Sequence, residues 1–212
     1  MAIVQIRTDV QIRETTSFWP DSSVKDSNND VRFIIEFGPQ PTLVSKPEEL
    51  RRPYGVELAS LILDDGKHGG VVGDAVFKGT YTTFQQYPLV CGPYKVPFLL
   101  NMPGSGHRVS GELYAVSSYG LGRVDELEGT TRGHYQRLPI QLTPENQESV
   151  TAAAEAYFAE TSYDEELWRK SEMMGFCCYS EKEAKGYVKR KDRPQNLTFL
   201  DHIRIFVSSS SD

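Results

Sequence analysis

The feature that most constrains the fold is a series of short strand patterns that starts at Ala75 and is interrupted by turn residues. A further strand is expected upstream, in the apolar run over residues 32–37. The strands expected from Ala75 onward span residues 75–83, 87–91, 96–100, 107–116, 136–142 and 203–207. Residues 151–159 are expected to form a strand, with a helix as the alternative because of their alanines. Helices are expected over residues 56–63, 119–127, 163–170 and 180–189. Many strands with a few inserted helices indicate an α+β domain with a closed or nearly closed sheet.

The length of the chain is that of one domain with short extensions. A chain of 212 residues can bury one sizeable core. Residues 14–30 are rich in Ser, Asn, Asp and Thr, so residues 1–30 are expected to be a mobile leader. The folded domain is expected to span residues 31–208, with residues 209–212 as a tail. Four prolines between residues 38 and 54 indicate a loop there, because proline interrupts regular elements.

The charge and the cysteine pattern limit the partners and the compartment. The formal net charge of -6 argues against general binding to nucleic acid or to an anionic membrane. No apolar run is long enough to cross a bilayer, and the N-terminus lacks the pattern of a secretory signal. Three cysteines, two of them adjacent at Cys177 and Cys178, indicate reduced thiols and a cytoplasmic protein. The four histidines lack the spacing of metal ligands, so no metal site is expected.

Residues 87–142 carry the most specific pattern in the chain. A Gly-rich turn at residues 103–106 is followed by a strand, a short helix with an acidic end, and another strand that begins near Tyr135. This order resembles the γ-glutamylcyclotransferase-like family, in particular its γ-glutamylamine cyclotransferase branch. The family's pattern of a hydrophobic residue, two acids, a hydrophobic residue and a glutamate is met by residues 124–128 (VDELE). The resemblance spans residues 73–207, and its C-terminal part looks like the plant members, the avirulence-induced-protein-like branch.

The resemblance implies a fold, a reaction and a catalytic residue. The fold would be α+β, with a small mixed or antiparallel β-barrel and a few flanking helices. The reaction would be an intramolecular aminolysis of a small γ-glutamyl amine or peptide, which releases 5-oxoproline and needs no cofactor and no metal. By motif the general acid/base would be Glu128, and burial would raise its pKa enough for it to exchange protons near neutral pH. From residue type alone, Glu128 is instead one of three acids at a solvated helix end.

A second signature of the family is a Tyr-Gly-(Thr or Ser)-Leu turn whose backbone N–H groups hold the substrate. This chain has no intact copy, and residues 31–72 are therefore atypical for the family. The nearest substitute makes four residues candidate substrate-binding residues: Tyr54, Gly55, Val56 and Glu57. Glu57 would repel a substrate carboxylate. The alternatives are that this Tyr-Gly is an incidental turn, or that the substrate turn follows the first strand at Phe37 and Gly38.

Tyrosines near the motif are further candidates for the site. Tyr135 follows Glu128 on the next strand, and it is expected to contact the substrate or, alternatively, to pack in the core. Relatives often carry another tyrosine at the place of Ala159, whereas here Tyr157 lies two positions earlier on the same strand face. The basic run over residues 182–193 is expected to be a solvated helix face and turn.

These patterns support functions of two different classes. The first is a cytoplasmic γ-glutamylcyclotransferase that acts on a small γ-glutamyl substrate as a monomer or weak dimer, without nucleic-acid or membrane partners. The alternative is a non-catalytic relative that has lost the substrate turn and binds a ligand or another protein. A different acyl transfer at the same place is a third function. Fold alone does not choose among them.

Overall fold

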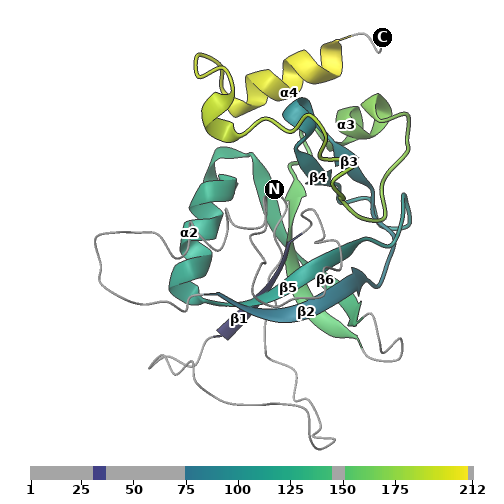
Figure 1. The fold of residues 1–212 in the computed structure, drawn as a ribbon, viewed down its shortest axis with the longest axis vertical. Coiled ribbons are helices and arrows are strands. Elements are labelled where there is room, and N and C mark those ends of the chain that lie inside the picture. Colours follow the sequence, from purple (N-terminus) through teal and green to yellow (C-terminus); the bar gives the residue numbers. More distant parts are fainter. Residues whose placement is uncertain (1–30, 37–74, 145–150, 210–212) are drawn as a thin grey trace, which may run out of the picture.

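The computed structural model describes residues 31–36, 75–144 and 151–209 (Figure 1). The strands are β1 (Val31–Glu36), β2 (Ala75–Thr83), β3 (Leu89–Cys91), β4 (Pro97–Leu99), β5 (Ser110–Ser117), β6 (Tyr135–Pro144) and β7 (Ala152–Ala159). The α-helices are α2 (Ser118–Glu128), α3 (Asp164–Lys170) and α4 (Phe199–Ser208). Short 3-10 helices are η1 (Pro93–Lys95), η2 (Thr130–Arg132) and η3 (Arg190–Asp192). The α+β class expected from the sequence is confirmed.

The described strands form one mixed sheet in the order β1-β5-β2-β6-β7-β4-β3. Most neighbours run antiparallel, while β4 pairs with β7 in parallel. One further parallel pair, Ile34 with Glu155, joins β1 to β7. Strand β1 therefore contacts β5 along its length and β7 at one position.

The strand pattern of the sequence agrees with most of this sheet. The expected strand over residues 75–83 has the bounds of β2, and residues 151–159 form strand β7 rather than a helix. The two short strands β3 and β4 lie within the expected ranges 87–91 and 96–100. The expected helices over residues 119–127 and 163–170 are present as α2 and α3. Periods of two and of about 3.6 residues were enough to identify these elements.

Residues 203–207 form the second half of helix α4, so the strand expected there is wrong. The Thr198 hydroxyl accepts a hydrogen bond from the Asp201 backbone N–H at 3.2 Å, and the Asp201 carboxylate accepts one from the Thr198 backbone N–H at 3.0 Å. This capping box starts the helix. Phe199, Ile203 and Phe206 then recur at helical spacing and pack on the core. The short apolar run alone fits a strand as well as a helix, so the upstream cap decides.

The helix expected over residues 180–189 is also wrong, because these residues form a series of turns. One helical bond, from the Ala184 N–H to the Ser180 carbonyl, is followed by tighter i→i−3 bonds such as that from Tyr187 to Ala184. Gly186 has φ 92°, which no helix contains. The expected leader at residues 1–30, the proline-rich loop at 38–54 and the helix at 56–63 lie outside the described residues.

Two clusters of buried side chains form the core on opposite faces of the sheet. Phe98 and Tyr157 belong to the first cluster, whereas their neighbours Leu99 and Phe158 belong to the second. Because successive side chains of a strand point to opposite faces, the two clusters are separated by the sheet. Helices α2 and α4 contribute to the first cluster with Leu121, Val124 and Ile203. Figure 1 shows α2 beside the sheet, starting where β5 ends, and α4 across the opposite end of the molecule.

Candidate active site

Helix α2 brings Glu128 to the inner side of the molecule. The Ser117 hydroxyl caps the start of the helix by accepting a hydrogen bond from the Gly120 N–H at 3.1 Å. The buried positions Leu121, Val124 and Glu128 recur at three- and four-residue spacing, so the carboxylate lies on the same stripe as the apolar side chains. Glu128 is therefore not part of a solvated helix end.

Gly129 ends the helix directly after Glu128. Its φ of 67° and ψ of 41° are left-handed, the conformation in which glycine is favoured after a helix C-terminus. A Cβ atom at this position would lie 2.5 Å from His134 Nδ1. The His134 ring stacks on Phe199, with ring centroids 4.2 Å apart and an interplanar angle of 22°. The chain turn after Glu128 thus needs glycine both for its backbone conformation and for the close approach of His134.

The Glu128 carboxyl is a weaker acid than an ordinary glutamate side chain. The side chain is only 5 % exposed, and this burial raises its pKa to about 7, against the opposing charge of Arg190. A carboxyl with these properties holds and gives up a proton near neutral pH.

Tyrosines surround Glu128. Tyr135 on β6, Tyr157 on β7 and Tyr163 before α3 are all buried. Burial raises the pKa of each of these phenols, and the charge of Glu128 raises it further. They therefore remain protonated at neutral pH. The sequence placed Glu128 and Tyr135 in one site, and the structure brings these two side chains together.

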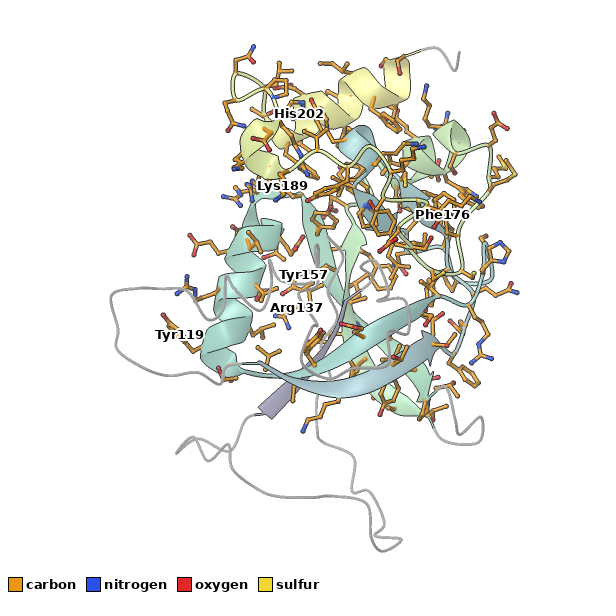
Figure 2. The ribbon with its side chains drawn as sticks, in the orientation of Figure 1. Tyr119, Arg137, Tyr157, Phe176, Lys189 and His202 are labelled. Carbon is orange, nitrogen blue, oxygen red and sulfur yellow. The ribbon has the colours of Figure 1, made fainter. Side chains whose placement is uncertain are left out.

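A polar network lies one helical turn before Glu128. Asp125 Oδ1 accepts hydrogen bonds from the Tyr157 hydroxyl at 2.5 Å and from Arg137 Nε at 2.9 Å. Arg137 Nη1 forms an ion pair with Glu155 Oε2 at 2.6 Å. Figure 2 shows Arg137 and Tyr157 close to each other between α2 and the sheet. Helix α2 is thereby tied to β6 and β7.

Sequence reasoning missed several residues around Glu128. His134 directly precedes Tyr135, and burial followed by the charges of Arg132 and Arg190 lowers its pKa. Arg190, in η3, belongs to the basic run that was expected to be a solvated helix face. The run is mostly exposed, as expected, but it consists of turns and the short 3-10 helix η3 rather than an α-helix. Figure 2 places the adjacent Lys189 near the end of α2 that lies away from Tyr119. No local pattern indicates this approach, since it depends on the long connection between α3 and α4.

The remaining candidates fall outside the described residues or outside the site. Tyr54, Gly55, Val56 and Glu57 lie outside the described ranges, as do Phe37 and Gly38. The Gly-rich segment joins β4 to β5, and the backbone N–H of Gly104 donates to the Gln86 carbonyl at 3.0 Å. A Cβ atom on Gly106 would lie 2.6 Å from the Tyr87 carbonyl oxygen, so this segment is a tight connection between strands.

The described residues contain neither a membrane-spanning helix nor a cluster of metal ligands. None of the helices in residues 31–36, 75–144 and 151–209 is long and apolar enough to cross a membrane. Over the same residues, no group of three or more His, Cys, Asp and Glu side chains is arranged to hold a metal ion.

Comparison with known proteins connects this geometry to a family. Residues 60–175 match the family described as "Gamma-glutamyl cyclotransferase, AIG2-like", a range that includes Glu128 and Tyr135. A protein of Arabidopsis thaliana named "Putative gamma-glutamylcyclotransferase" is 59% identical over 151 residues, which are 66% of this chain and 81% of that protein. The gamma-glutamylaminecyclotransferases of Bos taurus and Homo sapiens are 42% and 39% identical over 85 and 82 residues. The matches to these two enzymes cover 40% and 38% of this chain and about half of each enzyme (48% and 50%).

A solved structure is also similar to this chain. The crystal structure of an aig2-like protein from Mus musculus has a TM-score of 0.49 and 29% sequence identity. The match covers 56% of this chain and 80% of the mouse protein.

Proposed function

Because the chain belongs to the gamma-glutamyl cyclotransferase, AIG2-like family of enzymes, we propose that it releases 5-oxoproline from a γ-glutamyl amine or peptide, with Glu128 as general acid/base. The observation that carries this proposal is the buried Glu128 carboxyl, with its pKa of about 7, among protonated tyrosines. A group whose pKa is near the operating pH is suited both to accept a proton and to return it.

The proposed reaction takes place within one substrate molecule. The Glu128 carboxylate removes a proton from the substrate α-amine, and the amine nitrogen attacks the γ-carbonyl carbon. A C–N bond forms and closes a five-membered ring. The protonated Glu128 then donates its proton to the departing nitrogen, and the original amide C–N bond breaks. The products are 5-oxoproline and the free amine, so no water molecule is consumed.

The proposed site also needs groups that hold the substrate. Tyr135 is buried near Glu128, which supports a contact with the substrate or with its developing charge. We assign the carboxylate-holding turn to the segment Tyr54, Gly55, Val56 and Glu57, on the sequence pattern alone. The pairing of β1 with both β5 and β7 supports closure of the sheet into a small barrel around this site.

The test is product formation by the purified full chain. It would be incubated with γ-glutamyl-ε-lysine and a panel of γ-glutamyl dipeptides, and 5-oxoproline and free amine would be quantified by NMR. We expect both products in equal amounts. A folded protein that forms neither product, but binds a γ-glutamyl compound in calorimetry, would instead be the non-catalytic relative that the altered turn suggests.

The pH dependence of activity and stability is a separate expectation. Only ionised Glu128 can accept the first proton, so kcat/KM should rise with pH through an apparent pKa of about 7. Stability should change in the opposite direction. The folded pKa is raised above the unfolded value, so the folded state binds this proton more tightly and stability is lost as pH rises from about 4.3 through 7.

Denaturant unfolding of the wild type and of Glu128→Gln measures this effect. The free energy of unfolding of Glu128→Gln should equal that of the wild type near pH 4.5 and exceed it by about 3 kcal/mol at pH 8. A difference in the free energy of unfolding that does not change with pH would contradict the expected effect on stability. An acid limb of kcat/KM centred below pH 5.5 would contradict the expected effect on activity.

A further inference from the structure

The network at Asp125 has a defined relation to the proposed base. Asp125 lies three residues before Glu128 on α2, so the two side chains lie on one side of the helix about one turn apart. The Asp125 carboxylate is held from β7 by the Tyr157 hydroxyl and from β6 by Arg137 Nε. These contacts lie directly beside the last turn of the helix.

The register of β6 and β7 matches this helical spacing. Arg137 pairs with Tyr157, and two residues earlier on β6 Tyr135 pairs with Ala159. Paired residues on neighbouring strands share a face, and so do residues two apart on one strand. Two residues along a strand span about 6.6 Å, and the three residues from Asp125 to Glu128 rise about 4.5 Å along the helix, a similar step. Asp125 lies at the level of Arg137 and Tyr157, and the effect of the Glu128 charge on the Tyr135 phenol indicates that Glu128 lies at the level of Tyr135.

The chemistry of the network favours one fixed arrangement. Tyr157 is fully buried, so water cannot replace Asp125 as the hydrogen-bond acceptor of its hydroxyl. Arg137 is shared between two carboxylates, Asp125 and Glu155, through two different guanidinium nitrogens. Bonds between ionised groups are among the stronger hydrogen bonds, and the planar guanidinium gives them direction. The last turn of α2 is thus fixed in rotation and in height against the sheet.

We propose that Tyr157 and Arg137, acting through Asp125, are positioning residues that fix the last turn of α2 and thereby the location of the Glu128 carboxylate. The kinetic part of this proposal rests on the proposed function of Glu128. The positional part concerns only where that carboxylate lies, and it has a readout of its own.

The test uses Tyr157→Phe, which removes one hydroxyl and keeps the ring. The matched control is Tyr179→Phe. Tyr179 is also buried, and its hydroxyl donates to the Lys95 carbonyl at 2.5 Å, but it belongs to the second core cluster. Both full-length variants would be measured for kcat and KM, for thermal stability, and for the titration of Glu128 by ¹³C NMR of glutamate-labelled protein. Comparison with Glu128→Gln identifies the Glu128 resonance.

We expect Tyr157→Phe to lower kcat about tenfold, with KM changed less than about twofold, and to lower the Glu128 pKa measurably as the carboxylate leaves its buried place. Tyr179→Phe should leave kcat and the Glu128 pKa unchanged, although its melting temperature falls by a similar few degrees. If the two variants behave alike in kcat and in the titration, the network only stabilises the fold and the proposal is overturned.

Two further outcomes keep the test decisive. If the wild type forms no 5-oxoproline but Tyr157→Phe still shifts the Glu128 titration, the proposed reaction fails and the positioning role stands. If Tyr157→Phe does not fold, Arg137→Lys replaces it, because it keeps the charge but loses the two-way guanidinium geometry. A wild-type Glu128 titration in a folded Arg137→Lys variant would overturn the proposal.

Discussion

Replacing Glu128 by glutamine is expected to lower kcat for 5-oxoproline release by about 10³-fold, within the range that general acid–base groups contribute. Glutamine has nearly the same shape as glutamate, so it fits the buried position at the end of α2. It can neither accept the proton of the substrate amine nor supply one to the departing nitrogen. The fold should survive, because the change removes a carboxylate whose ionised form is penalised by burial.

The matched control for this variant is Glu126→Gln on the same helix. Glu126 is exposed, and its backbone carbonyl rather than its side chain accepts the hydrogen bond from Arg132 Nη2 at 2.7 Å. The same chemical change there should leave kcat within about twofold of the wild type, as is usual for exposed positions. Steady-state kinetics at pH 8 measures both variants. A folded Glu128→Gln enzyme that keeps more than a tenth of wild-type kcat would remove Glu128 from the mechanism.

The second large effect is expected for Phe98→Ala, which should lower the free energy of unfolding by about 3–5 kcal/mol. Phe98 is 0 % exposed, and its ring stacks on Tyr135 with centroids 5.4 Å apart and an interplanar angle of 11°. The rings of Tyr163 and Phe199 each lie with centroids 6.2 Å from it. Removing the ring leaves a cavity that these neighbours cannot all fill. The loss is a large share of the 5–15 kcal/mol that stabilises a typical domain.

Phe84→Ala is the control for that experiment. Phe84 is 49 % exposed, so losing its ring should cost no more than about 0.5 kcal/mol. Urea unfolding followed by tryptophan fluorescence compares the two variants at one pH. If both lose the same stability, Phe98 is not the packing centre that its ring contacts indicate. The expected loss at Phe98 also matters for the site, because it removes the ring on which Tyr135 rests.

The helix that carries Glu128 was predictable because its signal is local, whereas the buried place of Glu128 was expected from the family resemblance alone. A short amphipathic helix, an acidic end and a following glycine specify both the helix and its termination. The pairing of Asp125 with Tyr157 was not predictable from the same pattern. It depends on which residue of β7 faces which residue of β6, and on where α2 lies above both strands.

The two wrong assignments have the same kind of cause. The run at residues 203–207 is too short for its period to separate strand from helix, and only the Thr198–Asp201 capping box resolves it. Residues 180–189 contain good helix formers, but a left-handed Gly186 and tight turns prevail there. Local propensity is a weak guide wherever caps and tertiary contacts determine the backbone.

The pairing of β1 with β7 has a consequence for how the chain folds. Ile34 and Glu155 are 121 positions apart along the chain (155 minus 34), whereas β6 and β7 are joined by a short connection. Closing such a long loop costs more chain entropy than closing the short loop of the β6–β7 hairpin. We therefore expect β1 to join the sheet after this hairpin has formed. Until then the edges of β5 and β7 have unpaired backbone groups, which other chains could bind. Strand β1, which comes first among the described strands, would thus cover edges of the sheet that stay open until late in folding, and so protect them from association with other chains.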